Sequence, residues 1–268
     1  MSARAGGDRL LATGGVMQIE GSAGGGLVPW ALIAGLGTDA QIGGSGYCTQ
    51  AHLQKFSLRS CGVAVGLHDR LEVSYARQAF DLGEIIPGQS IDVDVFGAKV
   101  RLFGDAVFDQ DRWVPQVSAG VQYKKNRDFD FVPALLGARD AADSDFYVAA
   151  TKVWLAGPFS RTWLANATLR ASRANQFGIL GFGGDRDSRR VVPEISTAVF
   201  VTDALVAGAE FRDKPDNLRS FREQDAWDLF VAWFPDKHVS VTAAFADLGR
   251  IAMMPRQQGW YLSLQGSF

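Results

Sequence analysis

The sequence contains few of the residues that usually build catalytic and metal sites. Its 268 residues include three histidines and two cysteines. No His-x-His or His-Glu-x-x-His spacing occurs, so we expect no transition-metal site. Ser160 has no neighbouring histidine that would activate it as a nucleophile. We therefore predict that the protein is not an enzyme, with no catalytic residues, no metal and no cofactor.

The chain also lacks long apolar runs and basic clusters. Its longest apolar stretch, 27–37, is shorter than the ~18 residues of a membrane-spanning helix. The formal net charge is -2, and no basic stretch with interleaved aromatics indicates nucleic acid as a partner. Residues 1–9 contain no hydrophobic segment of a signal peptide. We interpret residues 1–14 as a disordered terminus, or as a start introduced where a signal peptide was removed.

What the sequence does have is alternation of apolar and polar residues over segments of about ten residues. Such alternation, with turn residues between the segments, is typical of antiparallel strands that are buried on one face. We expect one strand within 15–36 and one at the C-terminus. Ten further segments bring the expected number of strands to twelve: 56–67, 71–80, 91–103, 114–123, 146–156, 163–172, 191–201, 205–212, 227–234 and 239–245.

The connections between these segments alternate in length. Short ones such as 67–70 and 234–238 alternate with long ones such as 124–145 and 173–189. Short turns at one end and long loops at the other are the layout of transmembrane barrels. We predict an all-β, antiparallel, up-and-down transmembrane β-barrel of about twelve strands, formed by a single domain over 15–268. The glycine-rich part 15–28 forms either the first strand or a plug inside the lumen.

The last ten residues, "GWYLSLQGSF", alternate to the end of the chain. This strand resembles the terminal assembly signal of bacterial outer-membrane barrels, which the barrel-assembly machinery binds. The matching residues are Leu262, Leu264 and Phe268. The stretch "GGVMQIEGSAGGGLVPWALIAG" is similar to a proteobacterial outer-membrane family of unknown function. These resemblances imply a monomer in the bacterial outer membrane, in contact with membrane lipid and lipopolysaccharide, and they imply no particular activity.

Aromatic residues gather near the ends of the expected strands. Tryptophan and tyrosine rings prefer the interface between membrane and water, so this distribution predicts two aromatic girdles. The short turns and both termini are expected in the periplasm. One girdle then contains Trp113, Trp163 and Trp233, and the other contains Tyr123, Tyr147, Trp227 and Trp260.

The polar faces of the strands carry ionisable residues, and in a membrane barrel these faces line the interior. The basic candidates slightly outnumber the acidic ones, which predicts a narrow channel for small polar or anionic solutes. The alternative is a non-conducting barrel, filled by ion pairs, that acts as an envelope scaffold or binds a partner. An outer-membrane enzyme and a soluble β-sandwich are less favoured. The candidate lining residues are Glu72, Lys99, Arg101, Lys152, Arg170, Glu194, Glu210, Arg212 and Asp228.

Cys48 and Cys61 lie close together in the sequence. In the cytosol they would remain two thiols, whereas an exported chain meets an oxidising compartment. Because the other observations favour export, we predict a disulfide between them.

Overall fold

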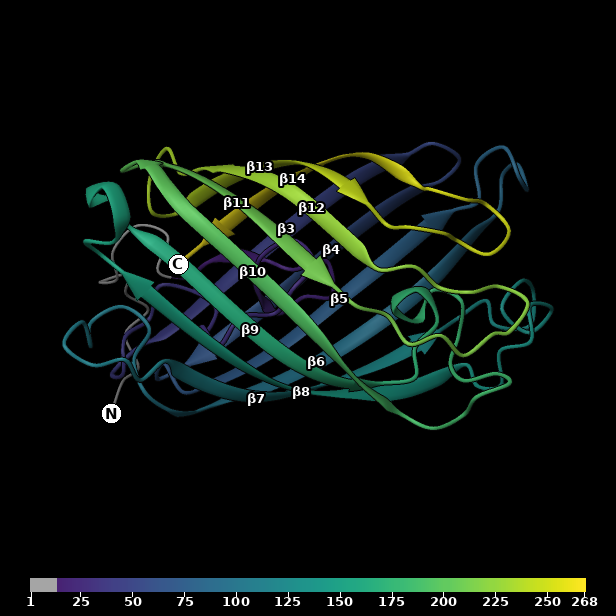
Figure 1. The fold of residues 1–268 in the computed structure, drawn as a ribbon, viewed down its shortest axis with the longest axis horizontal. Helices are drawn as coiled ribbons and strands as arrows, with labels where there is room; N and C mark the ends of the chain where they lie inside the picture. Colours follow the sequence, from purple (N-terminus) through teal and green to yellow (C-terminus); the bar gives the residue numbers. More distant parts are fainter. Residues whose placement is uncertain (1–13) are drawn as a thin grey trace.

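Twelve antiparallel strands close into a barrel in the computed structural model, which describes residues 14–268 (Figure 1). The barrel closes where the last strand pairs with the first along a continuous antiparallel ladder, from Gly259–Leu53 to Ser267–Ser45. The predicted fold class is therefore confirmed. The strands are β3 (Ile42–Leu53), β4 (Ser57–Leu67), β5 (Leu71–Asp81), β6 (Ser90–Phe103), β7 (Gln116–Asn126), β8 (Ala142–Trp154), β9 (Trp163–Ser172), β10 (Arg190–Thr202), β11 (Leu205–Arg212), β12 (Ala226–Trp233), β13 (Val239–Asp247) and β14 (Gln258–Ser267).

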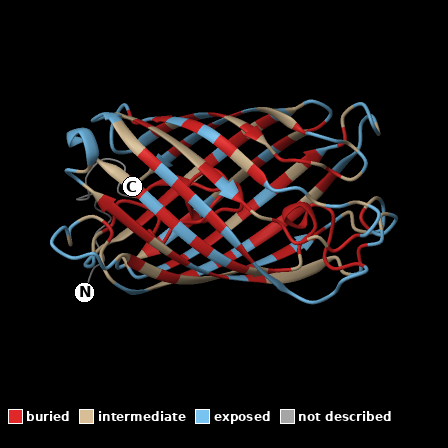
Figure 2. Cartoon of the chain, in the orientation of Figure 1, coloured by how far each residue is buried: buried red, intermediate tan, exposed pale blue. Residues whose placement is uncertain are grey.

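Burial alternates along the barrel strands, as the banding in Figure 2 shows. In β14, Leu262 and Leu264 are more than half exposed, whereas Ser263 and Gln265 are buried. The apolar face therefore points outward and the polar face points inward. A soluble barrel would show the opposite arrangement, so the outer surface is suited to contact with lipid.

The first barrel strand is β3, and the expectation of a barrel strand within 15–36 is wrong. Residues 14–37, which we call the plug, instead lie inside the barrel. Within the plug, β1 (Val16–Met17) and β2 (Ala23–Gly24) form a two-stranded hairpin. Residues 15–36 are buried throughout, because the wall surrounds them. The interpretation of residues 1–14 concerns a segment that, except for Gly14, lies outside the described residues.

The connections differ between the two ends of the barrel (Figure 1). One end has short turns at 68–70, 203–204 and 234–238, together with the longer segments 104–115 and 155–162. The C-terminus lies at this end. The other end carries one short turn, 54–56, and the long loops 82–89, 127–141, 173–189, 213–225 and 248–257.

The only helical turns in the described residues are η1 (Pro158–Ser160) and η2 (Gln176–Gly178). No helix in this part of the chain is long and apolar enough to cross a membrane. The first of the two turns lies in a connection at the short-turn end, and the second lies in the long loop 173–189.

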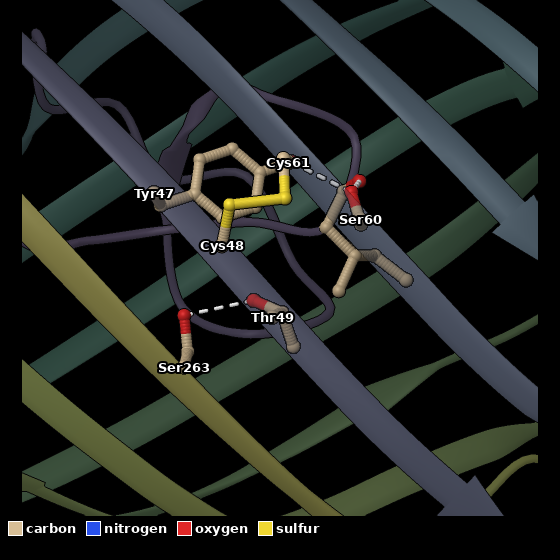
Figure 3. The surroundings of a disulfide bond; sticks show 7 residues. Tyr47, Cys48, Thr49, Ser60, Cys61 and Ser263 are labelled. Carbon is tan, nitrogen blue, oxygen red and sulfur yellow. Dashed lines mark hydrogen bonds between the residues drawn. A yellow bond between two sulfur atoms is a disulfide. The ribbon is translucent and has the colours of Figure 1, made fainter.

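Cys48 and Cys61 form the predicted disulfide between directly paired positions of β3 and β4 (Figure 3). Cys48 is exposed, so the bridge lies on the outer face of the wall. The neighbouring residue Tyr47 faces inward and forms a 2.9 Å hydrogen bond with Ser60. The disulfide therefore joins two wall strands next to the closing seam without reaching the lumen.

Candidate functional site: the occluded lumen

Glu20 of the plug lies at the centre of a buried group of charges. Its carboxylate pairs with Lys124 on β7, Arg170 on β9 and Arg212 on β11. The distance from Arg212 Nη1 to Glu20 Oε2 is 3.0 Å, and that from Arg170 Nη2 to the same oxygen is 3.7 Å. One plug residue is thus tied to an arc of wall that extends from β7 to β11.

Two wall carboxylates complete this group, which we call the charged layer. Asp145 on β8 lies 2.7 Å from Lys124 Nζ and 3.5 Å from Arg170 Nη1. Glu194 on β10 accepts a hydrogen bond from Arg170 Nε and lies 3.2 Å from Arg212 Nε. Buried charges are tolerated when they are paired and hydrogen-bonded. The wall supplies three cations and two carboxylates, so only Glu20 of the plug brings the layer to neutrality.

A buried ion pair forms a second attachment between plug and wall. Lys99 on β6 and Glu72 on β5 are 3.1 Å apart. Glu72 accepts hydrogen bonds from Ser22 Oγ at 2.9 Å and from the Ala34 amide at 2.9 Å. Lys99 donates to the carbonyl oxygen of Trp30 at 3.2 Å. The pair therefore holds both the early and the late part of the plug against the same side of the wall.

The middle of the plug approaches the opposite wall very closely. The Leu27 amide donates a 2.6 Å hydrogen bond to Glu210 on β11. A Cβ atom at Gly25 would lie 2.0 Å from Glu210 Oε1, and one at Gly26 would lie 2.0 Å from the Tyr261 hydroxyl. No side chain fits between plug and wall here, which explains the glycines at these positions.

A segment of the long loop 173–189 closes the lumen from the other end. Residues 174–183, which we call the inner loop, are buried. The carbonyl oxygen of Phe177 accepts a 3.2 Å hydrogen bond from Lys124 Nζ, and that of Ile179 accepts one of 2.7 Å from Asn126. The Arg212 guanidinium lies 4.3 Å from the centroid of the Phe177 ring, within the range of a cation–π interaction. Lys124 and Arg212 therefore contact both the plug and the inner loop.

A buried ion pair within the loop 213–225 supports the inner loop. Lys214 lies 3.1 Å from Glu223 and donates a 2.7 Å hydrogen bond to Gln176. Burial lowers the pKa of Lys214 and raises the pKa of Glu223 from their ordinary values, since both charges are removed from water. The loops at this end thus pack over the mouth and exclude solvent from this pair.

Comparison with known proteins identifies the family. Residues 13–265 match the model of a family described as "Protein of unknown function (DUF3034)". The chain belongs to this family. A search of curated protein sequences finds no significant match.

Solved structures with a similar fold are bacterial outer-membrane barrels. A KdgM porin has a TM-score of 0.53 at 8% identity, covering 84% of this chain and 99% of the porin. A NanC porin has a TM-score of 0.53 at 9% identity, covering 83% and 98%. Omp33 of Acinetobacter baumannii has a TM-score of 0.49 at 11% identity, covering 84% and 97%. The likeness to the two porins shows that the DUF3034 chain has the fold of bacterial outer-membrane β-barrel proteins.

Most lumen-lining candidates from the sequence are buried in the interior. Arg101 is only partly buried and lies at the short-turn end, where it pairs with Asp69 and Asp105. The prediction that Lys152 lines the lumen is wrong. Its neighbour Thr151 faces the plug and accepts a hydrogen bond from Ala31, so Lys152 lies on the opposite face of β8, covered by the segment 104–115. The seven buried interior candidates are Glu72, Lys99, Arg170, Glu194, Glu210, Arg212 and Asp228.

The expected aromatic girdles also need one correction. Tyr147 points into the lumen, where its hydroxyl lies 3.2 Å from Ser22 Oγ, so it is not part of a lipid-facing girdle. The assignment of Tyr147 to a girdle is wrong because the odd-numbered residues of β8, Asp145 and Tyr147, face inward, whereas Phe146 is exposed. Among the remaining expected girdle residues, Trp163 and Trp227 are partly exposed, and the exposed ones are Trp113, Tyr123, Trp233 and Trp260.

Three members of the charged layer, Glu20, Lys124 and Asp145, are absent from the candidates that the sequence indicates. Lys124 follows the predicted strand 114–123, and the alternation of Gln116, Ser118 and Gln122 would have placed it on the inner face. The sequence places Asp145 in the expected loop 124–145, whereas β8 begins at Ala142. No group of three histidine, cysteine, aspartate or glutamate side chains in residues 14–268 is arranged to hold a metal ion.

Proposed function

We propose that this protein is an outer-membrane channel for small polar or anionic solutes, closed in the described state by its own plug and inner loop. The observation that carries this proposal is the composition of the charged layer. Its wall is charged and hydrogen-bonding, and the plug supplies only the missing carboxylate, Glu20. If the plug moved aside, water and polar solutes could take over these interactions, as in barrels with a polar lumen.

The proposed preference for anions depends on the charged layer and not on the whole lumen. Rings of charge set the selectivity of pores. The interior wall has no overall excess of either sign, whereas withdrawal of Glu20 would leave Lys124, Arg170 and Arg212 facing Asp145 and Glu194. The interior basic residues are Lys99, Arg101, Lys124, Arg170 and Arg212, and the acidic ones are Glu72, Asp145, Glu194, Glu210 and Asp228.

We propose the bacterial outer membrane as the location, with the short turns and the termini in the periplasm. The asymmetry of the loops supports this orientation, because outer-membrane barrels place their short turns on the periplasmic side. Labelling of intact cells with a membrane-impermeant maleimide tests it. A cysteine at Arg219 in the loop 213–225 should react, and one at Asp203 in a short turn should not. The reverse pattern would contradict the orientation.

A non-conducting scaffold is the second candidate function. It is favoured by the double closure of the lumen, since Lys124 and Arg212 hold the plug and the inner loop at the same time. In that case the buried ion pairs would serve to fill the barrel permanently, and the long loops would be the functional surface.

Conductance in planar bilayers separates the two candidates. Glu20→Gln removes a carboxylate from the plug, and Glu194→Gln removes one from the wall between the same arginines. Both changes break buried pairs, which costs several kcal/mol, but only Glu20→Gln breaks pairs that hold the plug to the wall. If the plug is the gate, the open probability of Glu20→Gln should therefore be about tenfold or more above that of Glu194→Gln. Equal conductance of the two variants would count against plug gating. Absence of conductance in both would favour the scaffold.

A further inference from the structure

Four basic residues form a patch on the outer face of β4–β7, at the end with the long loops. We call Arg59, Arg77, Lys125 and Arg127 the outer basic patch. Arg77 on β5 lies opposite Asp94 on β6 in the strand register, and Asp94 lies opposite Lys125 on β7. These three residues therefore lie side by side. Their chain neighbours Gln78, Val93 and Lys124 are buried in the interior, so the patch points outward.

A row of aromatic residues indicates the depth of this patch. One alternation step nearer the middle of the wall, Tyr75, Phe96 and Tyr123 are paired across the same three strands. The rings of Tyr75 and Phe96 are 5.0 Å apart. Aromatic rings of this kind lie at the level of the lipid headgroups. The next row inward, Val73, Ala98 and Val121, is aliphatic. The outer basic patch therefore lies where the phosphate groups of the lipid are found.

The charges of the patch are only partly neutralised by protein groups. Arg77 lies 2.5 Å from Asp92, and Arg127 lies 3.4 Å from Asp94. Arg59 and Lys125 are exposed, and neither takes part in an ion pair within residues 14–268. Two cations at headgroup level thus remain available to an anion.

The rest of the rim differs from this face. On β11–β13 the corresponding outer positions at the strand ends are acidic: Asp213, Asp225 and Asp247. Between β8 and β10, Arg173 and Arg189 are both paired with Asp143. Among the outward-facing positions at the strand ends, the uncompensated basic charge therefore lies on β4–β7, which is a feature of a binding site and not of a uniform girdle.

We propose that the outer basic patch binds the phosphate groups of lipopolysaccharide in the outer leaflet. Guanidinium groups match phosphate oxygens in two-point contacts, and clustered lysine and arginine at a membrane surface attract anionic headgroups. Lipid A carries its phosphates on a bulky sugar at the level of the aromatic row, and its acyl chains would cover the aliphatic rows below. The inference depends on the proposed orientation of the loops and is independent of conduction.

The test measures binding of purified lipid A to the full chain in detergent. Arg59→Gln combined with Lys125→Gln should weaken binding of bisphosphorylated lipid A by about fivefold for each residue, the equivalent of ~1 kcal/mol per cation. Arg219→Gln combined with Arg222→Gln removes the same charge from an exposed loop and should leave binding unchanged. Heat-modifiable electrophoretic mobility verifies that both variants fold.

Dephosphorylated lipid A and phosphatidylglycerol identify the chemistry of the ligand. The parent protein should bind both more weakly than it binds bisphosphorylated lipid A. Equal binding of dephosphorylated lipid A would overturn the role of the phosphates, and equal binding of phosphatidylglycerol would overturn the choice of lipopolysaccharide. An equal effect of the two double variants would show that the patch is not the site. Cell labelling that places the long loops in the periplasm would also overturn the proposal, whatever the conductance shows.

Discussion

The wall and the plug of this barrel are held by different interactions. Each wall strand is paired with both of its neighbours through backbone ladders that run along most of its length. The plug has a ladder of two residue pairs, and side chains such as Glu72, Lys99 and Glu210 attach it to the wall. A ladder is lost only when many hydrogen bonds break together, whereas side-chain contacts can be exchanged singly. The wall is therefore held by more continuous interactions than the plug, and the proposed gating assigns the movement to the plug.

Removal of the plug should have the largest effect. A chain that lacks residues 14–37 should still form the closed wall, because no wall ladder includes them. Its conductance in planar bilayers should change from closed to persistently open. Heat-modifiable mobility in electrophoresis checks that the wall has formed. If a folded barrel without the plug remained closed, the inner loop alone would close the lumen. The distinction between wall and plug would then be weaker.

A charge on the outer face of the wall should have the next largest effect. Leu264→Arg places a cation among lipid-facing side chains, and near the middle of the membrane this costs ~2–4 kcal/mol. Leu135→Arg changes an exposed leucine in the loop 127–141 and should cost little. Denaturant unfolding of the barrel in lipid vesicles measures both. Equal costs would mean that Leu264 does not face lipid.

Most of the wall could be predicted from the sequence, because apolar and polar residues alternate along strands that have one face toward lipid and one toward the interior. The segments 163–172 and 205–212 match β9 and β11. The strand β3 was missed, since its outward positions include Gly46, Cys48 and Gln50 and give no apolar stripe. The number twelve was right only because a strand assigned to 15–36 replaced β3 in the count.

The interior was harder to predict than the wall. The plug is surrounded by protein on all sides, so its residues 27–37 form an apolar run without alternation, and either this run or residues 15–23 could suit a strand. Lys124 and Asp145 belong to a site that forms only when the plug brings Glu20 between them. No local pattern in the sequence specifies these ion pairs. The three residues come from separate parts of the chain, and their contact depends on the closure of the barrel.

The disulfide should matter to the wall and not to the plug. Replacing Cys48 and Cys61 by serine removes a bridge that constrains the unfolded chain, and a short closed loop of this kind contributes up to ~3 kcal/mol. Unfolding in vesicles should therefore require less denaturant, while the conductance of the folded barrel stays unchanged. A change in conductance would show that the β3–β4 pair transmits strain to the plug.

The smallest change that tests how firmly the wall holds the plug is the substitution of a wall glycine by alanine, which adds one methyl group. A Cβ atom at Gly66 on β4 would lie 2.2 Å from the carbonyl oxygen of Ala34 in the plug, so Gly66→Ala must push the plug aside. At Gly46 on β3 the nearest atom would be 3.7 Å away, and alanine fits. Alanine is favoured over glycine in a strand by ~0.5–1 kcal/mol, so Gly46→Ala should stabilise the barrel slightly.

Gly66→Ala should instead lower the stability by ~1–3 kcal/mol, as overpacking does, and should increase the open probability of the channel. Unfolding midpoints and single-channel recordings of the two variants provide the comparison. If Gly66→Ala destabilised the barrel without opening it, the plug would be fixed as firmly as the wall. Buried side-chain contacts would then hold the plug as strongly as the ladders hold the strands, and the scaffold function would be favoured over the channel.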